Sequence, residues 1–224
     1  FSGIKCLNLH GTDSCIFKDK ANYVHIVDMD SKTDSFYDTS VYNATRQTVP
    51  SIGDIDDDGN MEAVFWFNED NNNRYGIMVF DLVERNLDFG FKESGIIDDI
   101  INPYQGNFVL KGHPVLVDLN NDNKLEIAVS IFYDDFQNYE WATDWFTELF
   151  IFSNDGVKLF SKCGASEIRG DCNGGNFQLD VWEGTNPFIL DYNKDGIDDI
   201  CFLKDKKPLG ILEYMGLNCY NYSG

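Results

Sequence analysis

The stretch Asp54-Ile-Asp-Asp-Asp-Gly-Asn-Met-Glu62 decides the expected fold of this chain, because its pattern occurs twice more. The other copies are Asp118-Leu-Asn-Asn-Asp-Asn-Lys-Leu-Glu126 and Asp191-Tyr-Asn-Lys-Asp-Gly-Ile-Asp-Asp199. Each copy has oxygen-bearing side chains at positions 1, 3, 5 and 9, and Gly or Asn, which tolerate a left-handed backbone, at position 6. Ca²⁺ binds about six to eight oxygens, which a tight loop with alternate side chains turned inward supplies. The pattern therefore predicts three Ca²⁺ sites.

The positions within the loops define the predicted ligands. Positions 1, 3, 5 and 9 would bind through their side chains, whereas position 7 would offer only its backbone carbonyl, so its residue type varies. The predicted sites are Asp54, Asp56, Asp58, Asn60 and Glu62 in the first loop, Asp118, Asn120, Asp122, Lys124 and Glu126 in the second, and Asp191, Asn193, Asp195, Ile197 and Asp199 in the third.

The loops have two other interpretations. An EF-hand needs Glu at position 12, where this chain has Phe65, Ser130 or Phe202, so the pattern is not an EF-hand. Asp, Asn and Gly also build ordinary surface turns. The second loop fits a cation site less well than the others, because Asn123 replaces Gly and Lys124 adds a positive charge.

A longer repeat surrounds the loops. An apolar strand is expected before each loop, at residues 49–55, 113–119 and 186–192, and after it, at 62–67, 126–132 and 199–203. A hairpin follows, and it occurs four times, with its first strand at 23–27, 75–80, 148–152 and 209–213. The first Asp of each loop recurs after 64 and then 73 residues, from Asp54 to Asp118 and from Asp118 to Asp191. Four strands at such a period are typical of a β-propeller blade.

The expected architecture is thus all-β, a single propeller region over residues 1–224 with four-stranded blades. The blades would cover residues 1–47, 48–111, 112–184 and 185–224, the first being partial because it lacks a cation loop. Three arrangements stay open: a part of a larger propeller, four blades that close on themselves, or an open array that assembles. An array that does not close would expose edge strands, which pair readily with other chains.

The repeat resembles the FG-GAP/VCBS repeat of integrin-α-type propellers. The resemblance rests on the segment from Asn186 to Ile200, which best fits the DxDxDGxxD pattern of that family, and on the segment from Pro50 to Gly59. Within the family, the chain is weakly similar to the T-cell immunomodulatory protein group of cell-surface glycoproteins. The resemblance implies a Ca²⁺-binding propeller, and about three structural Ca²⁺ ions are expected.

Composition indicates where the chain functions. The net charge of −21 argues against binding to nucleic acid or anionic membranes, which recruit Lys and Arg, and no stretch is apolar enough to cross a membrane. Six cysteines fit three disulfides, of which a sequential pairing (Cys6–Cys15, Cys163–Cys172, Cys201–Cys219) is one of fifteen. Sequons at Asn43 and Asn221 predict N-glycosylation. An extracellular protein, secreted or part of an ectodomain, is expected.

The sequence favours a non-enzymatic role in adhesion or in recognition of a protein or glycan. No catalytic residues are predicted, since the three histidines, His10, His25 and His113, accompany no nucleophile or metalloprotease motif. The aromatic stretch 133–146 and Arg169-Gly170-Asp171 are candidate binding segments, each with an ordinary structural loop as its alternative. The alternatives for function are a glycoprotein subunit of an extracellular filament or coat, and a carbohydrate-binding or carbohydrate-active propeller.

Overall fold

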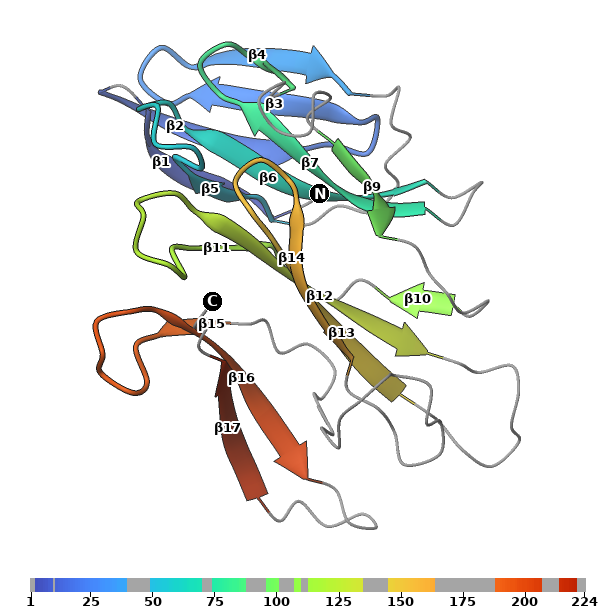
Figure 1. Ribbon diagram of the computed structural model, residues 1–224. Helices are drawn as coiled ribbons and strands as arrows, with labels where there is room; N and C mark the ends of the chain where they lie inside the picture. The colour runs from blue at the N-terminus through green and yellow to red at the C-terminus, as the bar shows by residue number, and fades with distance from the viewer. Residues whose placement is uncertain are drawn as a thin grey trace. The chain divides into compact units, whose positions relative to one another are not determined.

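The computed structural model (Figure 1) describes residues 3–9, 11–39, 49–69, 74–87, 96–100, 107–109, 113–134, 145–163, 188–206 and 214–220. These residues form β-strands and no helix, and all strand pairs are antiparallel. The predicted all-β class is therefore confirmed. Within this described part of the chain, no helix has the length and apolar character needed to span a bilayer.

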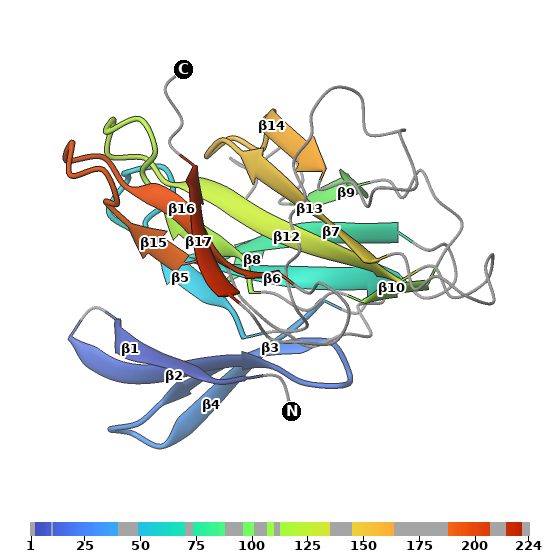
Figure 2. The same ribbon diagram turned by 90° about the horizontal axis from the view of Figure 1, so that it is seen from below.

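The chain divides into two compact units. The first contains Phe1–Pro103, Asn123–Leu125 and Asn154–Val157, and the second contains Tyr104–Asp122, Glu126–Ser153 and Lys158–Gly224. Each unit contains two sheets, in which consecutive strands are mostly neighbours (Figure 2).

The first unit begins with a four-stranded sheet in the order β1-β2-β3-β4, and its second sheet has the order β5-β6-β7-β8 with β9 paired to β7. The strands of the first sheet are β1 (Lys5–Leu9), β2 (Thr12–Lys18), β3 (Tyr23–Asp28) and β4 (Thr33–Asp38). Those of the second are β5 (Ser51–Gly53), β6 (Glu62–Glu69), β7 (Arg74–Asp81), β8 (Asn86–Leu87) and β9 (Ile96–Ile100).

One core joins the two sheets of the first unit. Ile16, Val24 and Ile26 of β2 and β3 pack with residues of β6 and β7 that include Phe65 and Met78. Along β2, burial alternates with a period of two, as in a strand with one covered face. Residues 62–66 and 76–80, in contrast, are buried at consecutive positions, so β6 and β7 are covered on both faces.

One charged residue lies on the covered face of the first sheet. Lys18, at the end of β2, is only 1% exposed. Burial lowers the pKa of its ammonium group to about 8, although the nearby carboxylate of Asp19 acts in the opposite direction.

The second unit contains a sheet in the order β10-β12-β13-β14, with β11 paired to β12, and a sheet in the order β15-β16-β17. Its core includes Val117, Leu119, Ala128, Leu149, Ile151 and Ile200. The strands are β10 (Asn107–Val109), β11 (Val115–Val117), β12 (Glu126–Asp134), β13 (Trp145–Phe152), β14 (Lys158–Cys163), β15 (Phe188–Leu190), β16 (Asp199–Lys206) and β17 (Tyr214–Tyr220).

The segment expected as a partial first blade, without a cation loop, contains a sheet of four strands, in which β1 and β2 form an antiparallel pair. Near the C-terminus, the hairpin strand expected at residues 209–213 lies outside the described residues, and β17 pairs directly with β16 over seven residues.

Candidate metal centre

The three acidic loops occupy the same place in three sheets. They connect β5 to β6, β11 to β12 and β15 to β16, each time between antiparallel neighbours. The residue at position 9 pairs with the residue that precedes position 1, as in Gly53 with Glu62, Val117 with Glu126 and Leu190 with Asp199. Each loop therefore closes one strand pair and starts from the same register.

The backbone of the three loops has one shared conformation. Position 6 has positive φ in every copy: 91° at Gly59, 68° at Asn123 and 87° at Gly196. This confirms the prediction made for position 6. Position 4 is also left-handed, with φ of 63° at Asp57, 60° at Asn121 and 62° at Lys194. The sequence did not indicate this second position clearly, because Lys is a poor residue for it.

The carboxylate at position 1 organises each loop from inside. The backbone N–H of position 5 donates to it at 3.1 Å in the first loop, 3.2 Å in the second and 3.1 Å in the third. In the first and third loops, the N–H of the position 6 glycine donates to its other oxygen at 3.0 Å. These bonds hold Asp54, Asp118 and Asp191 at the start of a tight turn.

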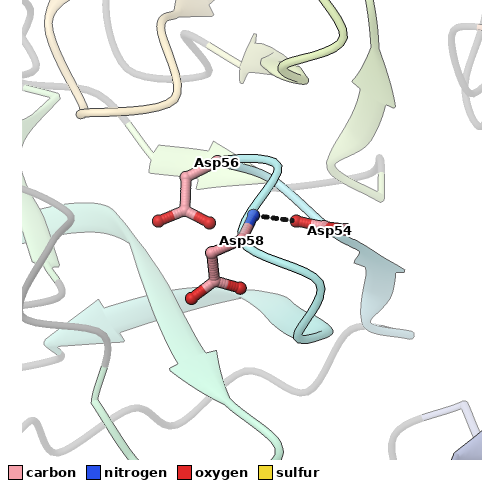
Figure 3. A group of neighbouring side chains, drawn as sticks. All are labelled: Asp54, Asp56 and Asp58. Atoms are coloured by element: carbon pink, nitrogen blue, oxygen red, sulfur yellow. Dashed lines mark hydrogen bonds between the residues drawn. The ribbon is translucent and has the colours of Figure 1, made fainter.

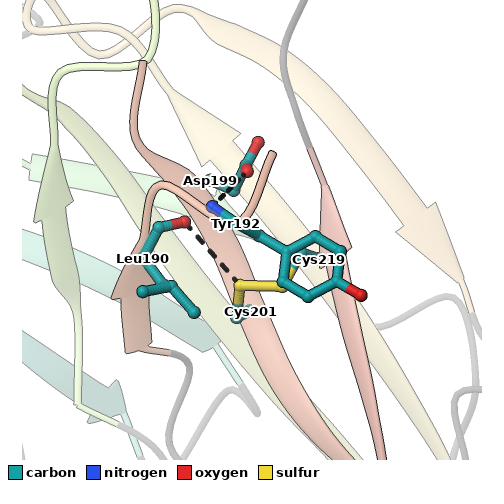
Figure 4. Close-up of a disulfide and its surroundings, with 5 residues drawn as sticks. All are labelled: Leu190, Tyr192, Asp199, Cys201 and Cys219. Atoms are coloured by element: carbon teal, nitrogen blue, oxygen red, sulfur yellow. Dashed lines mark hydrogen bonds between the residues drawn. A yellow bond between two sulfur atoms is a disulfide. The ribbon is translucent and has the colours of Figure 1, made fainter. Parts of the chain in front are cut away.

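The carboxylate at position 9 lies beneath each loop. Glu62, Glu126 and Asp199 are only 3%, 3% and 2% exposed. In all three loops one of its oxygens accepts the backbone N–H of position 2, at 2.8, 2.8 and 3.0 Å (Figure 4 shows Tyr192 and Asp199). A buried carboxylate needs such partners, since its desolvation is otherwise costly. Position 9 thus fixes the loop to its second strand.

Two of these buried carboxylates have further features. Burial raises the pKa of Glu126, although the N–H of Leu119 acts against the shift, and the carboxylates of Asp122 and Asp118 raise it further. The Oδ1 atom of Asp199 is buried and has no hydrogen-bond partner among the described residues. A bound cation would satisfy both features, because it favours the charged form and accepts an oxygen ligand.

The first loop brings three carboxylates together. Oxygens of Asp54, Asp56 and Asp58 all lie within 4.8 Å of one another (Figure 3). Ca²⁺–oxygen distances of about 2.3–2.6 Å allow two ligands of one ion to lie at most about 5.2 Å apart. The three side chains therefore fit a single ion of this kind. The second and third loops have an amide, Asn120 or Asn193, at the position of Asp56.

The amide side chains at position 3 are held by neighbouring carboxylates. Asn120 donates its Nδ2 to Glu126 at 3.1 Å, and Asn193 donates its Nδ2 to Asp195 at 2.8 Å. In each loop the amide Oδ1 accepts the N–H of position 5 at 2.9 Å. In the second loop these bonds bring the side chains of positions 3 and 9 together, and in the third loop those of positions 3 and 5.

At position 7, the backbone N–H contacts the carboxylate of position 5 in two of the loops. The N–H of Asn60 and of Ile197 donates to the position 5 carboxylate, at 2.7 and 2.9 Å. The Asn60 side chain also donates to Asp58 at 3.1 Å, and Lys124 at the same position is half-buried. Asn, Ile and Lys share only their backbone groups, so position 7 has no common side-chain role.

Two predicted disulfides are present. Cys6–Cys15 joins β1 to β2, and Cys201–Cys219 joins β16 to β17 (Figure 4), in both cases between residues in direct register. Disulfides are typical of proteins outside the cytosol. Cys163 ends β14, whereas its predicted partner Cys172 lies outside the described residues.

Other predicted features also fall outside the described residues. They are the sequons at Asn43 and Asn221, the tripeptide Arg169-Gly170-Asp171, and residues 135–144 of the aromatic stretch. The two ends of that stretch extend β12 and β13, where Tyr133 pairs with Phe146.

Comparison with known proteins adds no relative: no family model, no curated protein and no solved structure matches this chain.

Proposed function

We propose that this chain is an extracellular, Ca²⁺-stabilised β-propeller region of the FG-GAP/VCBS type, which serves adhesion or recognition and not catalysis. About three Ca²⁺ ions would be structural. Asp54, Asp56, Asp58 and Glu62 would hold the first ion together with the carbonyl of Asn60. The corresponding residues, Asp118, Asn120, Asp122, Lys124 and Glu126, and Asp191, Asn193, Asp195, Ile197 and Asp199, would hold the other two.

One observation supports the proposal above all: three loops of different sequence share a backbone. Lys194 has the same left-handed φ as Asp57 and Asn121, although Lys gains nothing locally from that conformation. The shared bonds, from position 5 to position 1 and from position 2 to position 9, surround the same group of oxygens each time. A common requirement for a cation explains why three sequences keep one geometry.

A cation would also remove an electrostatic cost. The first loop places three carboxylates side by side in a chain with a net charge of −21. Like charges at this separation repel, and a divalent ion converts the repulsion into attraction. The ion would hold the end of each strand pair rigid, so that neighbouring loops keep a fixed shape for a partner.

Thermal unfolding of the full chain in excess CaCl₂ and in EDTA tests the proposal. We expect the Tm to fall on chelation, because an ion that binds only the folded state stabilises it by about 2.7 kcal/mol per site at a free concentration 100 times its Kd. An unchanged Tm would contradict the proposal. Light scattering over a protein concentration series identifies the alternative: a particle mass that rises with concentration would favour a subunit of a filament or coat.

A matched pair of variants makes the test specific to the third loop. Asp195→Ala removes a predicted ligand, whereas Asp198→Ala removes an exposed carboxylate at position 8 of the same loop. Asp195→Ala should lower the Tm in Ca²⁺ and leave it almost unchanged in EDTA, while Asp198→Ala should have little effect in either. Equal destabilisation by Asp195→Ala in both conditions would disprove its assignment as a ligand.

A further inference from the structure

The outward face of the β1–β4 sheet carries aromatic and acidic side chains. We call it the aromatic–acidic face and define it by Phe17, Asp19, Tyr23, His25, Asp34 and Phe36. The opposite face of the same sheet packs into the core through Ile16, Val24 and Ile26. Because side chains alternate along a strand, the residues between these core positions project to the other side.

The aromatic part forms a row across three strands. Phe17, His25 and Phe36 are in direct register on β2, β3 and β4. The rings of Phe17 and His25 are stacked, with centroids 4.6 Å apart and planes at 4°, and Tyr23 meets Phe36 edge-on at 5.7 Å. Phe36 is 62% exposed, the largest value among the exposed large hydrophobic side chains of the described residues. A held but exposed ring of this kind is an available contact surface.

The acidic part surrounds the histidine. Asp34 Oδ2 lies 3.0 Å from His25 Nδ1, and Asp19 Oδ2 lies 3.4 Å from His25 Nε2. Two carboxylates on one imidazole leave at least one net negative charge, even when both ring nitrogens are protonated. The outward positions of the four strands also include Asp13 and Asp38, and none of them is Lys or Arg.

The composition of this face differs from that of the faces by which the sheets pack together. The core of the first unit is made of Ile, Val, Ala, Phe, Met and Leu side chains. Covering the aromatic–acidic face with another apolar sheet would bury two carboxylates that share one imidazole, which is costly. A second copy of this acidic chain would bring like charges together for the same reason. A cationic partner would instead be attracted by the carboxylates and could also stack on the aromatic rings.

We propose that the aromatic–acidic face binds an arginine-bearing segment of a basic protein partner. A planar guanidinium stacks on an aromatic ring and at the same time donates parallel hydrogen bonds to a carboxylate. Phe36, directly opposite His25, supplies the exposed ring, and Asp34, two residues earlier on the same face of β4, supplies the carboxylate. The proposal gives a partner to the recognition role inferred above, yet it rests on the β1–β4 sheet alone and not on the cation loops.

The histidine provides the measurement. The chain has only three histidines, so the His25 ring signal in an NMR spectrum, assigned with His25→Asn, reports directly on this face. The full chain is titrated with a hexa-arginine peptide in saturating CaCl₂, which keeps the acidic loops occupied. We expect a saturable shift of the His25 signal, a smaller effect at the His113 signal, and weaker binding of hexalysine.

Three variants test the contribution of the face. Phe36→Ala and Asp34→Asn should each weaken hexa-arginine binding by about three- to tenfold, since stacking and charge-assisted bonds contribute comparable amounts. Met29→Ala removes another exposed apolar side chain, 52% exposed in the β3–β4 turn, and should leave binding unchanged. Because all three side chains are largely outside the core, the variants should fold.

Several results would overturn the proposal. They are an unchanged His25 signal, equal binding of hexalysine and hexa-arginine in all variants, a response to neutral oligosaccharides but not to hexa-arginine, and a His25 shift that depends on protein concentration alone. The last two would assign the face to a glycan or to a second copy. Since EDTA-dependent stability and the His25 titration are separate readouts, failure of one proposal is distinguishable from failure of the other.

Discussion

In the first unit, the first two strands of each sheet are connected in different ways. Strand β1 ends at Leu9 and β2 begins at Thr12, and the Cys6–Cys15 disulfide links the two strands covalently. Between β5 and β6 the chain makes the eight-residue loop from Asp54 to Met61, whose carboxylates converge. One sheet is thus closed by a covalent bond, and the other is closed by a loop with excess negative charge.

Each connection has its own local support. In the β1–β2 turn, Asn8 accepts the N–H of Gly11 at 2.9 Å and donates to Asp13 at 3.0 Å. In the β5–β6 loop, Asp54 accepts N–H groups from Asp58 and Gly59. Both turns use side chain-to-backbone bonds, yet only the second collects charges that repel. The first unit therefore has a disulfide at one sheet and, under our proposal, a Ca²⁺ site at the other.

Removal of the disulfide should produce the largest effect. The variant Cys6→Ser/Cys15→Ser loses the constraint that the bond places on the unfolded chain, about 2–3 kcal/mol for a loop of this length. The loss in the free energy of unfolding should be the same in Ca²⁺ and in EDTA, as measured by urea denaturation. The matched variant Cys201→Ser/Cys219→Ser removes a disulfide that closes a longer loop, of separation 18, and should cost slightly more. A loss that appears only in EDTA would show that the two connections are coupled.

Substitution of one glycine in each of the two connections should lower the free energy of unfolding by about half as much as loss of the disulfide. Gly11 and Gly59 have φ of 87° and 91°, and a Cβ at either position would meet nothing within 4 Å. Substitution by Ala therefore costs only backbone strain, about 1–2 kcal/mol. We expect Gly11→Ala to cost the same in Ca²⁺ and EDTA, whereas Gly59→Ala should cost more in Ca²⁺, because a strained loop holds its ligands less well. Denaturant titrations in both buffers measure the difference, and identical costs at Gly59 would contradict a cation at this loop.

Much of the strand pattern could be predicted from the sequence, for a clear physical reason. Alternating and continuous apolar runs are typical of strands. The strands β6, β7, β12 and β13 accordingly include the ranges predicted for them. The first strands before the loops are shorter than expected: β5 is Ser51–Gly53, whereas residues 49–55 were predicted. Apolar residues at strand ends, such as Ile55, contribute to the core without pairing. The apolar pattern indicates which residues are buried, but backbone pairing between strands covers a shorter range than the buried segment.

Other features could not be predicted because they depend on distant partners. The strand β2 begins with three consecutive polar residues, Thr12, Asp13 and Ser14, so no apolar alternation marks its start, although it pairs with both β1 and β3. The row of Phe17, His25 and Phe36 follows from the registers of two strand pairs, which no local pattern specifies. In the loops, the composition of positions 1, 3, 5 and 9 was a strong signal, but the left-handed position 4 was not, since Asp, Asn and Lys occupy it.

The smallest expected effect on stability concerns a turn that the two sheets of the first unit build in the same way. Asp28 and Asp81 end the third strands of their sheets, and each accepts two backbone N–H groups of the following turn. At Asp28 the bond from the Ser31 N–H is the main cause that holds the pKa of the carboxyl below its usual value of 3.8. A carboxyl with a lowered folded-state pKa stabilises the protein above its unfolded pKa, and this contribution is lost as the pH falls through the folded pKa.

Asp28→Ala should therefore lower the free energy of unfolding at neutral pH, and its difference from wild type should shrink in acid. Urea denaturation in EDTA, from neutral pH to below pH 3.8, measures this difference without a contribution from bound cations. Asp30→Ala is the control, because it removes one charge from the same turn, where the Asp30 N–H and not its carboxylate bonds to Asp28. If both variants lost stability with the same pH dependence, the cause would be net charge and not the turn carboxylate. The Asp28 carboxylate would then have no stabilising role of its own in this turn.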